Sequence, residues 1–151
     1  MVEGDSIPAV QVMTADGAAF DMATLGTGRT IVYFYPKDDT SGCTREALDF
    51  TALAADFAAA GVRVVGVSKD SPRAHVKFAA KHDLSVELLS DEAGTACAAF
   101  GVWVEKSMYG KTYMGIERAT FLFVDGCCTK IWRKVKVPGH AALVLAQAIA
   151  A

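Results

Sequence analysis

The chain alternates between segments with strand-like and helix-like spacing of apolar residues. Residues 30–35 and 62–67 are almost wholly apolar, as expected for strands buried inside a sheet. Between these runs, apolar residues that include Phe50 and Phe57 recur at helical spacing. The pattern therefore predicts a strand, a helix over about 43–60, and a second strand.

Two tight turns predict β-hairpins. An Asp-Gly dipeptide between two strand-like runs is a strong hairpin signal. The chain has two such arrangements: residues 9–13 and 18–22 around Asp16-Gly17, and residues 119–124 and 129–132 around Asp125-Gly126.

The remaining pattern completes an alternation of strands and helices. Ser71 followed by Pro72 is typical of a helix N-cap and first helical position. We expect a helix from Ser71-Pro72 to about His82, a strand at 86–89, a short helix at 95–100, a loop rich in Gly, Tyr and Lys at 101–117, and a final helix that begins at Gly139 or His140.

This order of elements predicts the fold class. Strand–helix alternation implies right-handed crossovers and parallel strands, to which the last hairpin adds antiparallel ones. The prediction is an α/β, thioredoxin-like fold with an N-terminal β-hairpin and a central mixed sheet flanked by helices. No linker, repeat or low-complexity segment interrupts the chain, so we expect residues 1–151 to form a single domain.

Composition and charge narrow the function classes. Apolar residues make up 52% of the chain and charged residues 21%, as in an ordinary globular protein. A net charge of −2 gives no reason to expect a nucleic-acid or membrane partner, and Arg133, Lys134 and Lys136 form the one basic cluster. The N-terminus has no signal-peptide pattern, so we expect a cytoplasmic protein.

Four cysteines fit a reducing compartment better than a disulfide framework, because the chain is long enough to fold without bridges. The sequence contains no C-x-x-C motif and no Cys/His spacing typical of zinc sites. We therefore expect neither a metal nor a cofactor, and any cysteine chemistry would belong to the thiols themselves.

Cys43 has the surroundings of a reactive thiol. A strand–loop connection delivers it to the first turn of a helix, where the helix dipole favours a thiolate. Thr40 can place a hydroxyl near the sulfur, and Pro36 stiffens the loop. Arg118 enters an antiparallel strand at the same sheet end, so it is the candidate cation beside Cys43. The alternatives are a small buried cysteine, an N-cap threonine and a surface arginine.

The motif around Cys43 resembles a known family. Pro36-x-x-x-Thr40-x-x-Cys43 is similar to the active-site signature of the peroxiredoxins. The longer segment from Tyr33 to Ala47 resembles their bacterioferritin comigratory protein (peroxiredoxin Q) branch. Further matches in the same order are Val67 to Ser71, Met108 to Arg118, and Lys134 to Ala141.

The resemblance implies a thiol-dependent peroxidase that reduces hydrogen peroxide and organic hydroperoxides. Cys43 would attack the peroxide and become a sulfenic acid. Thr40, Arg118 and the backbone N–H of Cys43 would hold the peroxide. Glu46 either orients Arg118 or is an ordinary charge on the helix surface. The implied partners are a peroxide and a thiol reductant (thioredoxin, glutaredoxin or glutathione), and the branch is often monomeric, so we expect a monomer.

The resolving cysteine of many relatives has no counterpart here. Leu48, which we expect to be partly exposed, stands five residues after Cys43, and residues 78–81 contain no cysteine. Cys127 and Cys128 are expected in the turn of the last hairpin, at its end far from Arg118. They are expected to be turn thiols or a strained vicinal pair.

These departures favour a one-cysteine mechanism in which an external thiol reduces the sulfenic acid. The alternatives are a two-cysteine mechanism with Cys97 as resolving cysteine, although Cys97 also fits a buried apolar position, and a holdase or binding module on the same fold. A dithiol oxidoreductase would need a cysteine where Thr40 stands. Trp103, Tyr109 and Tyr113 either wall the active-site pocket or cover the core.

Overall fold

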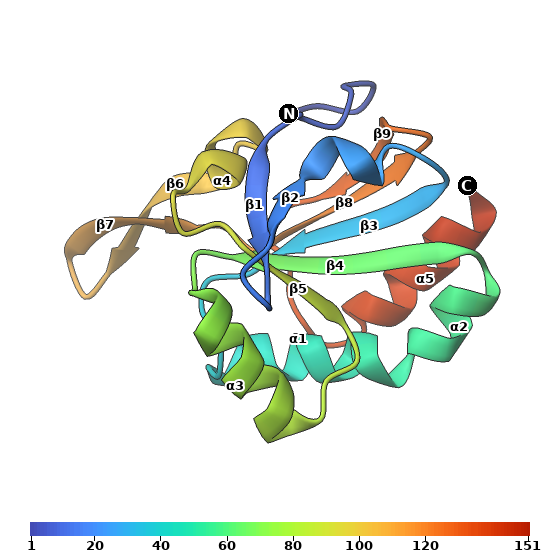
Figure 1. The fold of residues 1–151 in the computed structure, drawn as a ribbon. Coiled ribbons are helices and arrows are strands. Elements are labelled where there is room, and N and C mark those ends of the chain that lie inside the picture. The colour runs from blue at the N-terminus through green and yellow to red at the C-terminus, as the bar shows by residue number, and fades with distance from the viewer.

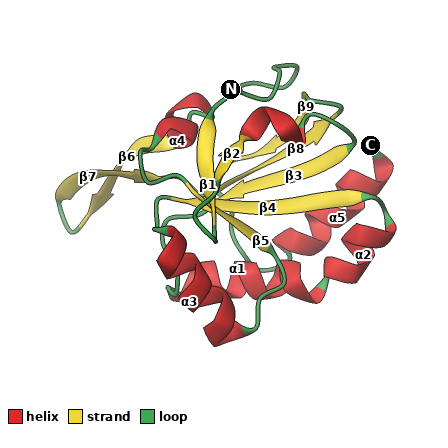
Figure 2. Cartoon of the chain, viewed as in Figure 1, coloured by secondary structure: helices red, strands yellow, loops and turns green.

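The structure, a computed structural model, describes residues 1–151 and consists of a central sheet with helices on both faces (Figures 1 and 2). The seven-stranded sheet has the order β2-β1-β5-β4-β3-β8-β9, and a separate two-stranded sheet is formed by β6 and β7. The strands are β1 (Gln11–Thr14), β2 (Ala19–Asp21), β3 (Arg29–Phe34), β4 (Val62–Ser68), β5 (Glu87–Ser90), β6 (Trp103–Met108), β7 (Lys111–Ile116), β8 (Ala119–Val124) and β9 (Cys127–Trp132). The helices are α1 (Ser41–Ala52), α2 (Ala54–Ala59), α3 (Pro72–His82), α4 (Thr95–Ala99), α5 (His140–Ala150) and the 3-10 helix η1 (Met22–Leu25).

The predicted mixed sheet and both Asp-Gly hairpins are confirmed. Strands β3, β4 and β5 are parallel, whereas β8 runs antiparallel to β3 and β1 runs antiparallel to β5. Phe34, the last residue of β3, pairs with Ala119, the first residue of β8. This register brings the loop after β3 and the residue before β8 to the same edge of the sheet.

Alternation along β3 divides the core into two layers. Tyr33 and Tyr35 point into one layer with α1, α2, α3 and α5, whereas Val32 and Phe34 point into the other layer with η1 and α4. Figure 2 shows the same division, with α1, α2, α3 and α5 on one side of the sheet and α4 on the other. The two faces of the sheet are therefore separate environments for buried side chains.

The expected helix over about 43–60 is wrong in its continuity. Helix α1 begins at Ser41, which places Cys43 in the first turn as expected, but the helical run breaks at Leu53, where a 3-10-type bond joins the Leu53 N–H to the Phe50 carbonyl at 3.2 Å. Phe50 and Phe57 face the same core layer on either side of the break. Since their apolar spacing continues across Leu53, periodicity carries no sign of the interruption.

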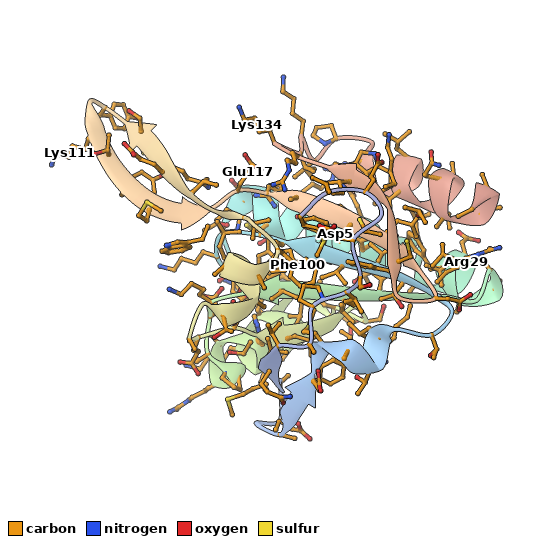
Figure 3. The ribbon with its side chains drawn as sticks, turned by 90° about the horizontal axis from the view of Figure 1, so that it is seen from above. Asp5, Arg29, Phe100, Lys111, Glu117 and Lys134 are labelled. Carbon is orange, nitrogen blue, oxygen red and sulfur yellow. The ribbon has the colours of Figure 1, made fainter.

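The expected loop over 101–117 is also wrong, because most of it forms the β6–β7 hairpin. Tyr109 and Gly110 both have positive φ (52° and 77°), as a type I′ hairpin turn requires. The strands are paired along their length but mostly exposed, so they lack the hydrophobic alternation that marks a half-buried strand. Viewed from above, the arm that carries Lys111 projects away from the body (Figure 3).

Two local expectations are confirmed. Ser71 caps α3, and its hydroxyl accepts a hydrogen bond from the Ala74 N–H at 3.1 Å. Leu48 is 38% exposed on α1. None of the helices combines the length and apolar character required to cross a lipid bilayer.

Candidate active site

Cys43 lies in the first turn of α1, at the edge of the sheet where β3 ends. Thr40 is the N-cap residue, with extended backbone angles, and its carbonyl accepts the first helical hydrogen bond from the Thr44 N–H at 2.8 Å. The Cys43 side chain is only 2% exposed. The thiol is therefore sheltered from bulk water while it lies at the positive end of the helix.

Arg118 is the side chain that contacts the sulfur. Its Nη2 lies 3.3 Å from Cys43 Sγ, and its Nη1 donates to Glu46 Oε1 at 2.7 Å. Gly42 leaves room for this approach, because a Cβ at that position would lie 3.2 Å from Arg118 Nη2. The expectation that Arg118 lies beside Cys43 is matched by this geometry.

Glu46 is a buried partner of Arg118 rather than a charge on the helix surface. It is 1% exposed, and its Oε2 has no hydrogen-bond partner. Burial raises the pKa of Glu46 to about 7, and the attraction of Arg118 only partly opposes this shift. Burial acts to lower the pKa of Arg118, but Glu46 and Cys43 raise it overall.

The Thr40 hydroxyl does not contact the sulfur in this structure. It donates instead to the Lys37 carbonyl at 2.8 Å, across the exposed loop that precedes α1. Pro36 is also exposed and lines a hollow of about 380 Å³ beside the β6–β7 arm. Both residues thus lie on the exposed loop before α1, and neither is bonded to Cys43.

The aromatic residues of the expected loop take different places. Trp103 and Tyr113 line the same hollow as Pro36, so they wall a pocket. Tyr109 is 97% exposed in the turn of the arm and neither walls the pocket nor covers the core. Lys69 also lines the hollow, and its Nζ lies 4.2 Å from the centre of the Trp103 ring.

The other cysteines lie away from Cys43. Cys97 and Cys128 belong to the core layer on the opposite face of the sheet, and both are buried. Burial raises the pKa of the Cys97 thiol far above its usual range and that of Cys128 to about 11. Cys127 is exposed and pairs with Val124, the last residue of β8, as expected for an end far from Arg118. Cys128 is thus not the turn thiol that was expected.

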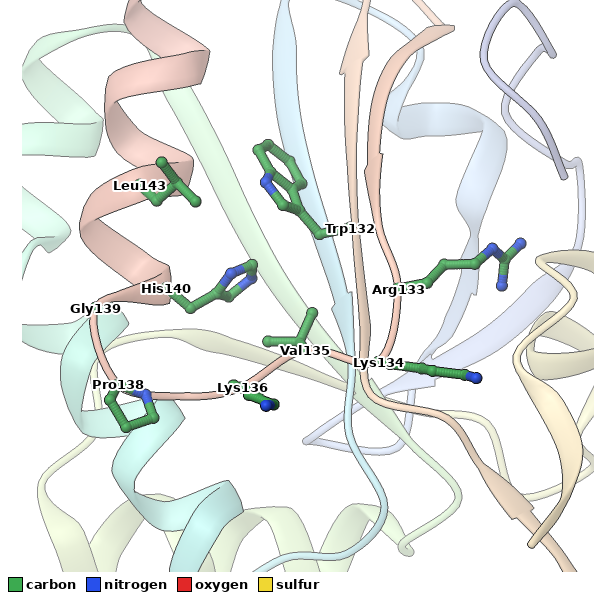
Figure 4. A pocket seen from close by; sticks show the side chains of 9 residues that line it. All are labelled: Trp132, Arg133, Lys134, Val135, Lys136, Pro138, Gly139, His140 and Leu143. Atoms are coloured by element: carbon green, nitrogen blue, oxygen red, sulfur yellow. The ribbon is translucent and has the colours of Figure 1, made fainter.

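The basic cluster near the C-terminus forms part of the lining of a second hollow, of about 540 Å³, at the start of α5 (Figure 4). The side chains of Arg133 and Lys134 extend away from His140, which points into this region. His140 Nε2 lies 2.8 Å from the Thr120 hydroxyl, and burial lowers the pKa of His140 to about 4. The basic groups of Arg133 and Lys134 therefore do not converge on the same point as His140.

Sequence reasoning overlooked two buried polar residues close to the site, Asp38 and His75. His75 Nδ1 lies 2.7 Å from Asp38 Oδ2, and the His75 side chain is fully buried. The residues are far apart in the sequence, and His75 stands on α3 among ordinary helical positions. The sequence offered one indication that Asp38 belongs to the site, namely its place in the segment Tyr35-Pro36-Lys37-Asp38 before Cys43.

Comparisons with known proteins identify the family of this chain. The AhpC/TSA family model matches residues 3–128. A putative peroxiredoxin bcp of Coxiella burnetii is 44% identical over 145 residues, which cover 95% of this chain and 96% of that protein. Peroxiredoxin Bcp of Xanthomonas campestris pv. campestris is 52% identical over 117 residues, which cover 77% and 73% of the two chains.

A solved structure of the Xanthomonas campestris bacterioferritin comigratory protein, from work on its alkyl peroxide reduction activity, has a TM-score of 0.89. It is 42% identical and covers 97% of this chain and 98% of its own. The family match, the sequence identities and the similarity of the fold all indicate the same family. This chain belongs to the AhpC/TSA family, in the bacterioferritin comigratory protein (peroxiredoxin Q) branch of the peroxiredoxins, and is a thiol-dependent peroxidase.

Proposed function

We propose that this peroxidase reduces hydrogen peroxide and organic hydroperoxides at Cys43 by a one-cysteine mechanism. The observation that carries the assignment of the site is the 3.3 Å contact between Arg118 Nη2 and Cys43 Sγ at the start of α1. A guanidinium at this distance stabilises a thiolate, and its remaining N–H groups can bind peroxide oxygens.

The first half-reaction is a two-electron oxidation of Cys43. The thiolate forms a bond to the terminal oxygen of the hydroperoxide while the O–O bond breaks, which leaves Cys43 as a sulfenic acid. The departing alkoxide or hydroxide takes up a proton and leaves as an alcohol or as water. Arg118 and the Cys43 backbone N–H stabilise the charge on the departing oxygen. In this proposal the Thr40 hydroxyl turns from Lys37 toward the peroxide.

The position of Arg118 is fixed by Glu46. The Nη1 contact of 2.7 Å fixes one edge of the guanidinium, which leaves the other edge for the sulfur and the peroxide. The hollow that contains Pro36, Trp103 and Ile116 offers apolar surface close by for the organic part of an alkyl hydroperoxide. The proposed activity toward organic hydroperoxides rests on that surface.

The second half-reaction uses external thiols. Cys97 lies in the core layer on the far side of the sheet from Cys43, and its thiol is fully buried. We therefore propose that one external thiol attacks the Cys43 sulfenic acid and releases water, and that a second thiol then releases Cys43. Thioredoxin, glutaredoxin and glutathione are the candidate reductants, and the protein acts as a cytoplasmic, single-domain monomer.

The intact mass of the protein after one equivalent of peroxide tests this mechanism. A one-cysteine enzyme gains one oxygen atom in the absence of reductant and then forms a mixed disulfide with added glutathione. A loss of two hydrogen atoms that disappears in Cys97→Ser would establish the two-cysteine mechanism instead. Cys127→Ser is the matched control, and it should leave the product of the parent protein unchanged.

A further inference from the structure

We propose that Asp38 and His75 are positioning residues for Cys43: together they fix the loop that sets the distance between its sulfur and Arg118. This inference rests on the proposed function, because it explains how the peroxidatic thiol is held in place. The two residues touch neither the sulfur nor Arg118. Their effect would pass through the backbone between Asp38 and the first turn of α1.

Asp38 is the anchor of this loop. Between Tyr35 and Gly42 it is the only buried residue, at 8% exposure. Its Oδ1 accepts from the Tyr35 hydroxyl at 2.6 Å, and its backbone N–H donates to Asp70 Oδ2 at 2.8 Å. With the His75 contact, side chain and backbone of one residue tie the loop to three different elements: the end of β3, the segment after β4, and α3.

Geometry fixes the proton arrangement of the pair. His75 Nε2 lies 3.0 Å from the Leu89 carbonyl oxygen, which can only accept, so Nε2 carries a hydrogen. A second proton must lie between His75 Nδ1 and Asp38 Oδ2, since the two atoms are 2.7 Å apart. The pair thus holds this proton away from water and is neutral as a unit, which lets it remain buried without another counter-ion.

The neighbouring residue adds a second attachment to the same helix. Asp39 has a positive φ of 59° and accepts from Lys81 Nζ at 2.7 Å, and its other oxygen lies 2.7 Å from His82 Nε2. These contacts are exposed, so each stabilises the loop little compared with the buried pair. Helix α3 therefore holds the loop at two successive residues, and Asp38 supplies the part shielded from solvent.

The test is the pH dependence of Cys43 alkylation by iodoacetamide, followed by mass spectrometry of the tryptic peptide 38–45. We expect Asp38→Ala to raise the pH of half-maximal alkylation by about one unit, because the sulfur loses its fixed position beside Arg118. Asp38→Asn retains hydrogen-bonding atoms for Tyr35 and His75 and should keep the parent midpoint. If Asp38→Ala does not fold, Tyr35→Phe should give a smaller rise in the midpoint.

Asp91→Ala is the matched control for lost stability. Asp91 is also buried, and it caps α4 on the other face of the sheet through the Ala96 and Cys97 N–H groups. Loosening of the fold alone would raise the plateau rate of alkylation without moving its midpoint. An unchanged midpoint in Asp38→Ala, or in Tyr35→Phe where only that variant folds, would overturn the proposal, as would an equal shift in Asp91→Ala. A parent protein that fails to reduce peroxides would refute the proposed function but leave this test intact.

Discussion

Tyr33 on β3 and Tyr35 just after it show how a hydroxyl group changes the contribution of a buried side chain to stability. Tyr33 and Tyr35 are both almost fully buried and pack in the same core layer. The Tyr33 hydroxyl has no hydrogen-bond partner, whereas the Tyr35 hydroxyl donates to Asp38 at 2.6 Å. Leaving a buried polar group unpaired costs free energy that a matched hydrogen bond does not.

The first prediction follows from this contrast. Tyr33→Phe should leave the free energy of unfolding unchanged or raise it by up to about 1 kcal/mol, because it removes an unpaired hydroxyl. Tyr35→Phe should lower it by about 1–2 kcal/mol, since Asp38 loses a partner. Urea unfolding measures both variants against the parent. A destabilisation of Tyr33→Phe as large as that of Tyr35→Phe would contradict the hydrogen-bond account.

A second prediction concerns Glu46, whose pKa burial raises to about 7 from an ordinary value of 4.5. Between these two pH values the unfolded carboxyl ionises while the folded one stays protonated, so the parent loses stability as the pH rises. Glu46→Gln has no carboxyl group at this position, so it does not lose this stability as the pH rises. Its stability relative to the parent should therefore increase by up to about 3 kcal/mol across the window and stay constant above it.

Urea unfolding of both proteins at a series of pH values measures this difference. The folded pKa of His140 is lowered to about 4, so its neutral form stabilises the fold above about pH 6.5, and that contribution is lost as the pH falls toward 4. The His140 effect is common to both proteins and cancels in the comparison. A difference that does not change with pH would show that Glu46 ionises normally in the folded protein.

At the scale of elements, the β6–β7 arm differs from the rest of the chain. Its strands pair only with each other, and exposed residues predominate in both of them. A two-stranded hairpin with little buried surface is marginally stable by itself. We therefore regard the arm as a unit that opens separately from the sheet.

The prediction is that backbone amides of residues 104–115 exchange with deuterium at least about a hundredfold faster than those of β3 and β4. Hydrogen exchange followed by mass spectrometry measures both segments in one experiment, and β8 serves as an internal reference for a fully buried strand. Protection of the arm equal to that of β8 would mean that it is packed against something in solution.

How far the elements could be predicted from sequence depended on the kind of signal each one carries. The buried strands, the capped helix α3 and the Asp-Gly hairpins have strong local signals, and all are present. The arm and the break at Leu53 have none: one is stabilised by cross-strand pairing without burial, and the other lies within an uninterrupted apolar stripe.

At the scale of the whole molecule, some contacts of the candidate site could be predicted from the sequence and others could not. The contact between Arg118 and Cys43 follows from strand order, which sequence patterns indicate well. The burial of Glu46 and the contact between Asp38 and His75 depend on how helices pack on the sheet, and no local pattern records that packing. For the same reason, the sequence pattern did not indicate which cysteines share a face of the sheet.

The whole fold separates Cys43 from the two other buried cysteines. Cys43 belongs to the layer of α1, whereas Cys97 and Cys128 belong to the opposite layer, so the sheet itself lies between them. In the proposed one-cysteine mechanism, the reductant therefore approaches from solvent near the loop before α1. We therefore predict that Cys43 alone reacts with peroxide.

Single-turnover peroxide reduction tests this claim most directly. The reduced protein is mixed with one equivalent of hydrogen peroxide and a dimedone-type sulfenic acid probe, and both peroxide loss and the labelled peptides are measured. We predict that peroxide disappears in step with labelling of Cys43 in peptide 38–45, and that Cys43→Ser shows neither. Undiminished peroxide consumption by Cys43→Ser, or labelling of Cys127 in place of Cys43, would contradict the account.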